Sequence, residues 1–134
     1  MLRAVVDTNV LVSGLLNASG PPGAVVHDIV RQRLEPVVCA QVMAEYAAVL
    51  ARRRFGFNRG EVRELLSLIG QLGTWADVAP YTGTPPLPDP ADWPFVACAL
   101  AAACPLITGN AKHFPARLGV QVITAREWVA QGHA

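Results

Sequence analysis

The chain has 134 residues, a length typical of one domain, and we expect a single domain spanning residues 1–134. Apolar residues make up 52% of the sequence and charged residues 16%, which excludes a disordered chain. The net charge of +1 excludes a globally basic nucleic-acid-binding protein, so any surface for RNA must be local.

The three cysteines, Cys39, Cys98 and Cys104, form no CxxC pair, and each lies in an apolar stretch. This pattern predicts buried free thiols in a reducing compartment. The longest apolar run, residues 95–107, is interrupted by a proline and is too short to span a bilayer. The first predicted strand starts too early for a signal peptide to precede it. We therefore expect a cytoplasmic protein that does not enter a membrane.

The first predicted element is a strand over residues 2–6, whose β-branched apolar run is typical of a strand buried on both faces. Asp7 follows it directly. In open α/β sheets, ligands and catalytic groups gather at the carboxyl ends of strands, so Asp7 is a candidate functional residue. It could equally be a helix cap or a turn residue, because Asp-Thr-Asn satisfies free backbone amides well.

Helical and strand patterns alternate along the rest of the chain. Apolar spacing predicts helices over residues 10–16, 25–34, 41–54, 62–72 and 95–103, and capping boxes precede the fourth of these (Asn58, Glu61) and a final helix (Thr124, Glu127). Short β-branched runs predict strands over residues 36–39, 74–78, 105–108 and 120–123, and loops are predicted at 19–23, 80–90 and 109–113. The alternation predicts an α/β domain with a mostly parallel sheet of about five strands, flanked by helices.

Three acidic residues stand where the predicted elements could bring them together. Asp7 ends the first strand, Glu45 interrupts an apolar helix face, and Asp92 opens a helix after a loop with five prolines. Two carboxylates about 4 Å apart repel by roughly 4 kcal/mol at an effective dielectric constant near 20, and a bound cation would offset that cost. Carboxylate oxygens suit Mg²⁺ or Mn²⁺, which can activate a water and stabilise charge on a phosphodiester.

Structural roles are open for the same acids. Glu45 could be a solvated helix residue, and Asp92 could be a helix N-cap with Pro94 in the first turn. Being a cap does not prevent Asp92 from binding a metal. Asp89 is interpreted as a turn residue beside Pro90.

Basic residues could be solvated helix ends or could follow a phosphate backbone. The residues predicted to contact RNA are Arg52, Arg53, Arg54 and Lys112, with Arg59, Arg63 and His113 as further candidates.

Four segments of the sequence resemble motifs of the PIN domain, and more narrowly of its VapC-like toxin branch, in the same order and with the expected spacing. They are Val-Val-Asp7-Thr-Asn9-Val-Leu-Val-Ser13, Glu45 ahead of Val-Leu-Ala-Arg-Arg, Asp89-Pro-x-Asp92 before Phe-Val-Ala-x-Ala, and Leu-Ile-Thr108-Gly109-Asn110 followed by His113-Phe114. The resemblance runs over nearly the full chain. It implies a metal-dependent ribonuclease on a Rossmann-like sheet, usually a homodimer held by a partner antitoxin.

Carried over residue by residue, the resemblance implies that Asp7, Glu45 and Asp92 take the acidic metal-binding positions. Asn9 takes the Asn of the opening motif, where it would orient Asp7 or the waters of the site. By family analogy the products of cleavage would carry a 5′ phosphate and a 3′ hydroxyl.

The sequence departs from the family pattern at Asn110, where many members have a fourth acid. A neutral amide attracts a second cation less than a carboxylate does, so we expect one metal ion, or a second ion held weakly until RNA supplies oxygens. Thr108 is close enough in sequence to contribute a hydroxyl to a metal-bound water.

The sequence therefore predicts an endoribonuclease for single-stranded RNA, with Mg²⁺ or Mn²⁺ at Asp7, Glu45 and Asp92 and with Asn110 in the catalytic set. One alternative is a PIN-like module that binds RNA or a protein without cleaving. Another is a domain that accepts a phosphoryl group on Asp7. It is disfavoured because the only lysine, Lys112, lies in a loop and not on a late strand.

Overall fold

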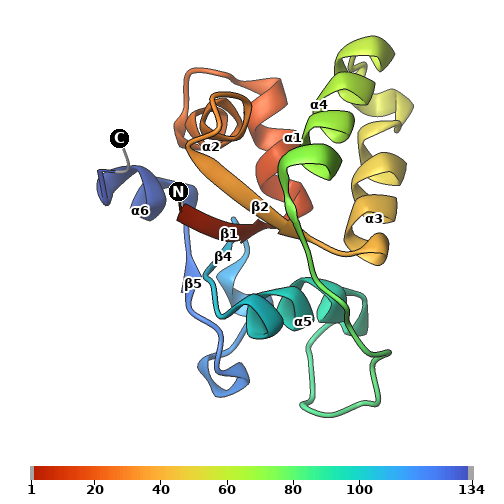
Figure 1. Ribbon diagram of the computed structural model, residues 1–134, viewed down its shortest axis with the longest axis vertical. Coiled ribbons are helices and arrows are strands. Elements are labelled where there is room, and N and C mark those ends of the chain that lie inside the picture. The colour runs from red at the N-terminus through yellow and green to blue at the C-terminus, as the bar shows by residue number, and fades with distance from the viewer. Residues whose placement is uncertain (1, 133–134) are drawn as a thin grey trace.

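A five-stranded sheet forms the centre of the molecule, and the computed structural model describes it within residues 2–132 (Figure 1). The strands are β1 (Leu2–Val6), β2 (Leu34–Val38), β3 (Thr74–Trp75), β4 (Leu106–Ile107) and β5 (Val122–Ile123). Their order is β3-β2-β1-β4-β5, and every neighbouring pair is parallel. The predicted α/β class with about five strands is confirmed, and the sheet is entirely parallel.

The central position of β1 follows from its sequence. Ala4, Val5 and Val6 are completely buried, because β2 and β4 pair with the two edges of β1 while helices cover its faces. A strand with no solvent face needs apolar residues at consecutive positions, not at alternate ones.

Six α-helices surround the sheet in the part of the chain that the structure describes. They are α1 (Thr8–Leu16), α2 (Pro21–Val30), α3 (Ala40–Leu50), α4 (Arg59–Leu72), α5 (Trp93–Ala102) and α6 (Ala125–Ala130), with short 3₁₀ turns η1 (Arg53–Phe55), η2 (Pro90–Asp92), η3 (Ala111–His113) and η4 (Ala116–Leu118). Helices α1 to α4 lie on one side of the sheet and α5 lies on the other (Figure 1), as expected for a parallel sheet covered on both faces. None of the helices in residues 2–132 has the length and apolar character needed to cross a bilayer.

The second helix differs from its prediction at both ends. Helix α2 begins at Pro21, inside the predicted loop over residues 19–23, because a proline in the first turn loses no helical hydrogen bond. It ends at Val30, where Gln32 adopts a positive φ of 60°, so Leu34 belongs to β2. The predicted continuation of this helix to residue 34 was therefore wrong.

Other boundaries are shorter than predicted. Strand β3 ends at Trp75, because the backbone N–H of Ala76 makes a last hydrogen bond to Val38 and the chain then leaves the sheet. Helix α3 ends at Leu50, before the arginine run, which continues into η1. In both segments, the sequence pattern continues beyond the last residue of the helix or strand. The pattern therefore overestimates the length of the element.

Gly23 permits the close approach that starts α2. A β-carbon built on this residue would lie 2.2 Å from the carbonyl oxygen of Ala18 and 2.5 Å from its carbonyl carbon. Both atoms belong to backbone, so a side chain here cannot be accommodated by a rotamer change. By contrast, a β-carbon on Gly70 in α4 would meet only side-chain atoms of Trp75 and Met43 at 3.7 and 3.8 Å.

We expect Gly23→Ala to lower the free energy of unfolding by about 1–3 kcal/mol or more, because the methyl group overlaps backbone. The matched control, Gly70→Ala, should raise it by up to about 1 kcal/mol, since alanine favours a helix interior. Urea unfolding followed by circular dichroism measures both. Equal stability of the two variants would contradict the close contact between Gly23 and the backbone of Ala18.

Candidate active site

The candidate site lies at the carboxyl edge of the sheet, between β1 and β4. The chain runs from β1 to β2 on one side and returns to β4 on the other, so the strand order reverses between β1 and β4. Asp7 follows β1 and Thr108 follows β4, and both are buried. In open parallel sheets, this reversal point is where a crevice for ligands forms.

Asp7 is held by two hydrogen bonds. Its Oδ1 accepts from the backbone N–H of Thr8 at 2.8 Å, and its Oδ2 accepts from the hydroxyl of Thr108 at 2.7 Å. Only 7% of the Asp7 surface is exposed. Asp7 is also the N-cap of α1, so the predicted capping role is confirmed, and this role leaves Asp7 a candidate functional residue.

Burial raises the pKa of Asp7 to about 6. Repulsion from the carboxylates of Asp92 and Glu45 also raises this pKa, while the hydrogen bonds from Thr108 and Thr8 oppose the shift. The three acids that are far apart in the sequence therefore act on one another through space. A neighbouring positive charge would favour the ionised form of Asp7.

Glu45 reaches the site from α3. Its carboxylate accepts a hydrogen bond from the hydroxyl of Thr8, so it is not simply a solvated helix residue. The next residue, Tyr46, is fully buried and donates its hydroxyl to the carbonyl oxygen of Val6. These two contacts fix α3 against the end of β1 and turn Glu45 toward the edge where Asp7 lies.

Asp92 lies at the end of η2, immediately before α5. Helix α5 starts without a side-chain capping hydrogen bond, so the capping role considered for Asp92 is not observed. Instead, Asp92 Oδ2 lies 3.0 Å from His113 Nδ1. Burial raises the pKa of Asp92, repulsion from Asp89 and Glu45 adds to the rise, and His113 opposes it.

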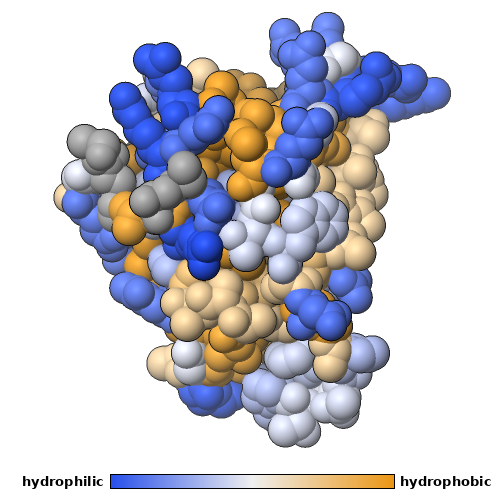
Figure 2. Space-filling view, in the orientation of Figure 1, coloured by the Kyte–Doolittle hydropathy of each residue, from blue (hydrophilic) through white to orange (hydrophobic). Residues whose placement is uncertain are grey.

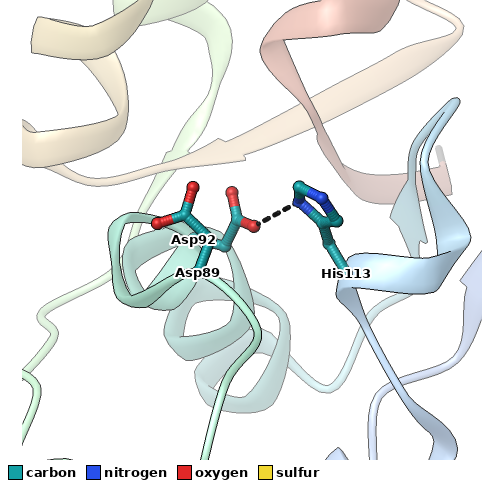
Figure 3. Close-up of side chains that lie close together, drawn as sticks. All are labelled: Asp89, Asp92 and His113. Carbon is teal, nitrogen blue, oxygen red and sulfur yellow. Dashed lines mark hydrogen bonds and ion pairs between the residues drawn. The ribbon is translucent and has the colours of Figure 1, made fainter.

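Asp89, Asp92 and His113 form a close group of metal-binding side chains (Figure 3). One ligand atom from each lies within 4.8 Å of the others. Within residues 2–132, no other group of three or more such side chains is this close, and Asp7 and Glu45 do not belong to this one. Two carboxylates and an imidazole are donors suited to a divalent ion such as Mn²⁺.

Sequence reasoning missed the proximity of Asp89 and His113 to Asp92. Asp89 is the turn residue that was predicted, since its side chain accepts from the backbone N–H of Ala91 at 3.0 Å. Its spacing of three residues from Asp92 could have indicated a shared face of a helical turn. No local signal indicated that His113 contacts Asp92, which is 21 residues away in the sequence.

The neutral residues of the predicted set link the loops at this edge. Asn9 Oδ1 accepts from the backbone N–H of Gly109 at 3.2 Å, and the backbone N–H of Asn110 donates to Thr108 Oγ1 at 3.0 Å. The hydroxyl of Thr108 thus accepts from Asn110 while its proton is directed to Asp7. These bonds hold the loop after β4 against the start of α1.

The basic residues fall into two separate places. Lys112 is exposed in η3 and precedes His113, whose ring contacts Asp92. Arg52 and Arg53 are exposed beyond the end of α3, and the guanidinium of Arg54 lies 4.9 Å from the centre of the Phe55 ring.

A family model described as the PIN domain matches residues 3–112. The chain belongs to the PIN domain family. Members are generally metal-dependent nucleases that bind divalent ions and act on RNA, so a nuclease-type function is indicated. No curated protein and no solved structure matches the chain significantly.

The raised pKa of Asp7 predicts a pH-dependent effect of Asp7→Asn. The folded state holds the Asp7 proton more tightly than the unfolded state, so wild-type stability falls as pH rises from about 4 to about 6. A shift from the ordinary value near 3.8 to about 6 corresponds to on the order of 2–3 kcal/mol.

Without divalent metal, Asp7→Asn should therefore be more stable than the wild type at pH 8 by up to that amount, and equal to it near pH 4. Thermal melting in EDTA across this pH range measures the difference. A destabilisation by Asp7→Asn that is constant from pH 4 to pH 8 would contradict the assigned electrostatic cost.

Proposed function

We propose that this chain is a metal-dependent endoribonuclease that cleaves single-stranded RNA, and that it is the toxin of a toxin–antitoxin pair. The observation that carries the proposal is the buried Asp7, whose carboxylate shares its electrostatic environment with Glu45 and Asp92 at the reversal point of a PIN-family sheet. The proposal includes a homodimer and a bound antitoxin protein. It also includes a cytoplasmic location, which the three free cysteines support.

In this proposal, Asp7, Glu45 and Asp92 hold Mg²⁺ or Mn²⁺. Charge supports the binding of a divalent ion by these residues. The three carboxylates repel one another, and burial raises the pKa of Asp7 and of Asp92. The bound ion would supply an activated water and neutralise charge on the phosphodiester. Thr108 and Thr8 orient Asp7 and Glu45 through their hydroxyls.

In the proposal, Asn9 has a supporting role and Asn110 belongs to the catalytic set. Asn9 positions the loop after β4, and Asn110 brings a neutral amide to the place where a fourth acid is common in the family. Asp89 and His113 add an oxygen and a nitrogen donor beside Asp92. We propose that these two residues bias the site toward Mn²⁺, because imidazole nitrogen suits transition metals better than Mg²⁺.

Basic side chains would position the RNA backbone without reading bases. Lys112 is the best placed, because it is exposed next to His113. Arg52, Arg53 and Arg54 are proposed as more distant contacts at the end of α3.

A second candidate function is a PIN module that binds RNA or a protein without cleaving. The neutral Asn110 favours it, as does the pairing of Asp92 with His113, which already supplies a partner for one acid of the site. Such a module would bind RNA equally well with and without divalent metal.

Cleavage of a labelled single-stranded RNA in Mn²⁺ tests the proposal. Asp7→Asn, Glu45→Gln and Asp92→Asn should each lower the rate by roughly 100-fold or more, because each removes charge that holds the ion. Asp77→Asn, which removes an exposed acid outside the site, is the matched control and should leave the rate unchanged. Equal rates in all four variants would contradict the assignment of Asp7, Glu45 and Asp92 as metal ligands. Metal-independent RNA binding without cleavage would favour the second candidate.

Calorimetry with MnCl₂ and with MgCl₂ tests the metal preference separately from activity. His113→Gln and Asp89→Asn should weaken Mn²⁺ binding by about 10-fold or more, and His113→Gln should change Mg²⁺ binding little. The matched controls are His27→Gln and Asp77→Asn, both at exposed positions. If His113→Gln leaves Mn²⁺ affinity at the wild-type value, His113 is not a ligand.

A further inference from the structure

A groove of about 670 Å³ lies between the end of α3, η1 and the first half of α4. Its floor is apolar and consists of Leu50, which is 2% exposed, together with the half-buried side chains of Phe57, Val62 and Leu66. The proposed nuclease function uses none of these side chains.

Four arginines surround this floor, and they are Arg52, Arg53, Arg59 and Arg63. Among the described residues, no acidic side chain lines the groove. The two ion pairs in residues 2–132 join Arg3 to Glu35 and His113 to Asp92, so neither involves these arginines. Figure 2 shows strongly hydrophilic side chains projecting at the upper right, where α3 and α4 meet in Figure 1. The groove therefore combines an apolar base with uncompensated positive charge.

We propose that this groove binds an acidic amphipathic helix of another protein. Apolar side chains of this helix, at helical spacing, would lie on the floor. Carboxylates on either side of them would pair with the arginines, because the planar guanidinium group forms bidentate hydrogen bonds with carboxylates. This inference goes beyond the proposed nuclease function, and binding measurements test it whether or not the chain cleaves RNA.

A second copy of the chain does not offer this ligand. The ten acidic residues are spread so widely that no stretch of 14 residues contains more than two of them. Two close pairs exist. Glu61 and Glu64 belong to α4, which builds the groove itself, and Asp89 and Asp92 lie beside His113 in the candidate active site. The complementary segment must therefore come from a different chain.

The floor favours a peptide over RNA. Bases bind to single-strand platforms by stacking on flat aromatic faces, and Phe57 is the one aromatic side chain among the lining residues. Leu50, Val62 and Leu66 are aliphatic and match leucine-like side chains instead. The arginines attract phosphates as well as carboxylates, so RNA is the competing outcome of the experiment.

Fluorescence anisotropy with the full chain in EDTA tests the proposal with a defined probe. The probe is a fluorescein-labelled peptide of about 14 residues with leucines at the i, i+3, i+4 and i+7 helical spacing and glutamates at the flanking positions. Its control has every glutamate replaced by lysine. We expect the acidic peptide to bind at least about 10-fold more tightly than the lysine peptide.

The double variant Arg59→Glu, Arg63→Glu should reverse this preference. Arg31→Glu, Arg33→Glu makes the same charge change at two exposed positions outside the groove and should preserve it. Val62→Thr keeps the size of a floor side chain while adding a hydroxyl, and it should weaken binding of the acidic peptide several-fold. Thermal melts confirm that each variant is folded.

Absence of acidic-peptide binding, or equal binding of the two peptides, would overturn the proposal. So would a single-stranded uridine oligomer that displaces the acidic peptide and loses affinity in the Arg59→Glu, Arg63→Glu variant, because it would identify the groove as an RNA site.

Discussion

The hydrogen bond from Thr108 to Asp7 joins the two strands between which the sheet reverses its order. A carboxylate buried at this depth needs donors, and Thr8 and Thr108 provide them from the two sides. Thr8 in turn donates its hydroxyl to Glu45, so one dipeptide, Asp7-Thr8, connects β1, β4 and α3. Tyr46 adds a second link from α3 to β1. The geometry of the candidate site thus depends on how one buried acid obtains its hydrogen bonds.

These hydrogen bonds do not compensate fully for burial, and the pKa of Asp7 remains about 6. Asp92 has a raised pKa as well, although His113 lies 3.0 Å from its carboxylate. Near neutral pH, the site therefore has a deficit of positive charge, which protons supply at lower pH and a divalent ion could supply in their place. In a structural ion pair, the neighbouring positive charge would instead lower the pKa of the acid. The electrostatics accordingly agree with the general metal dependence of the PIN family.

Local patterns predicted most of this fold. The consecutive apolar residues of β1, the Asn58 cap of α4 and the capping box at Thr124 each act within a few residues, and the structure shows all three. Contacts across the chain were not predictable in the same way. Asp92 could be identified as a candidate ligand by its place after the proline loop, but its partner His113 depends on how η3 folds back toward α5. Hydrophobic spacing carries no information on such a pairing, and the start of α2 at Pro21 was missed because prolines suit both loops and first helical turns.

The proline-rich segment shows how the chain positions acids that no strand carries. The indole N–H of Trp93 donates to the carbonyl oxygen of Ala79 at 2.8 Å, and the Trp93 ring packs against Tyr81 with centroids 5.4 Å apart. Arg117, from beyond β4, donates to the carbonyl oxygen of Pro86 at 3.0 Å. Prolines also restrict the unfolded chain, which lowers the entropy lost when the segment becomes ordered. Because the segment is anchored at both α5 and η4, it acts as a fixed support for Asp89 and Asp92. Asp92 can therefore act electrostatically on Asp7 without belonging to the sheet.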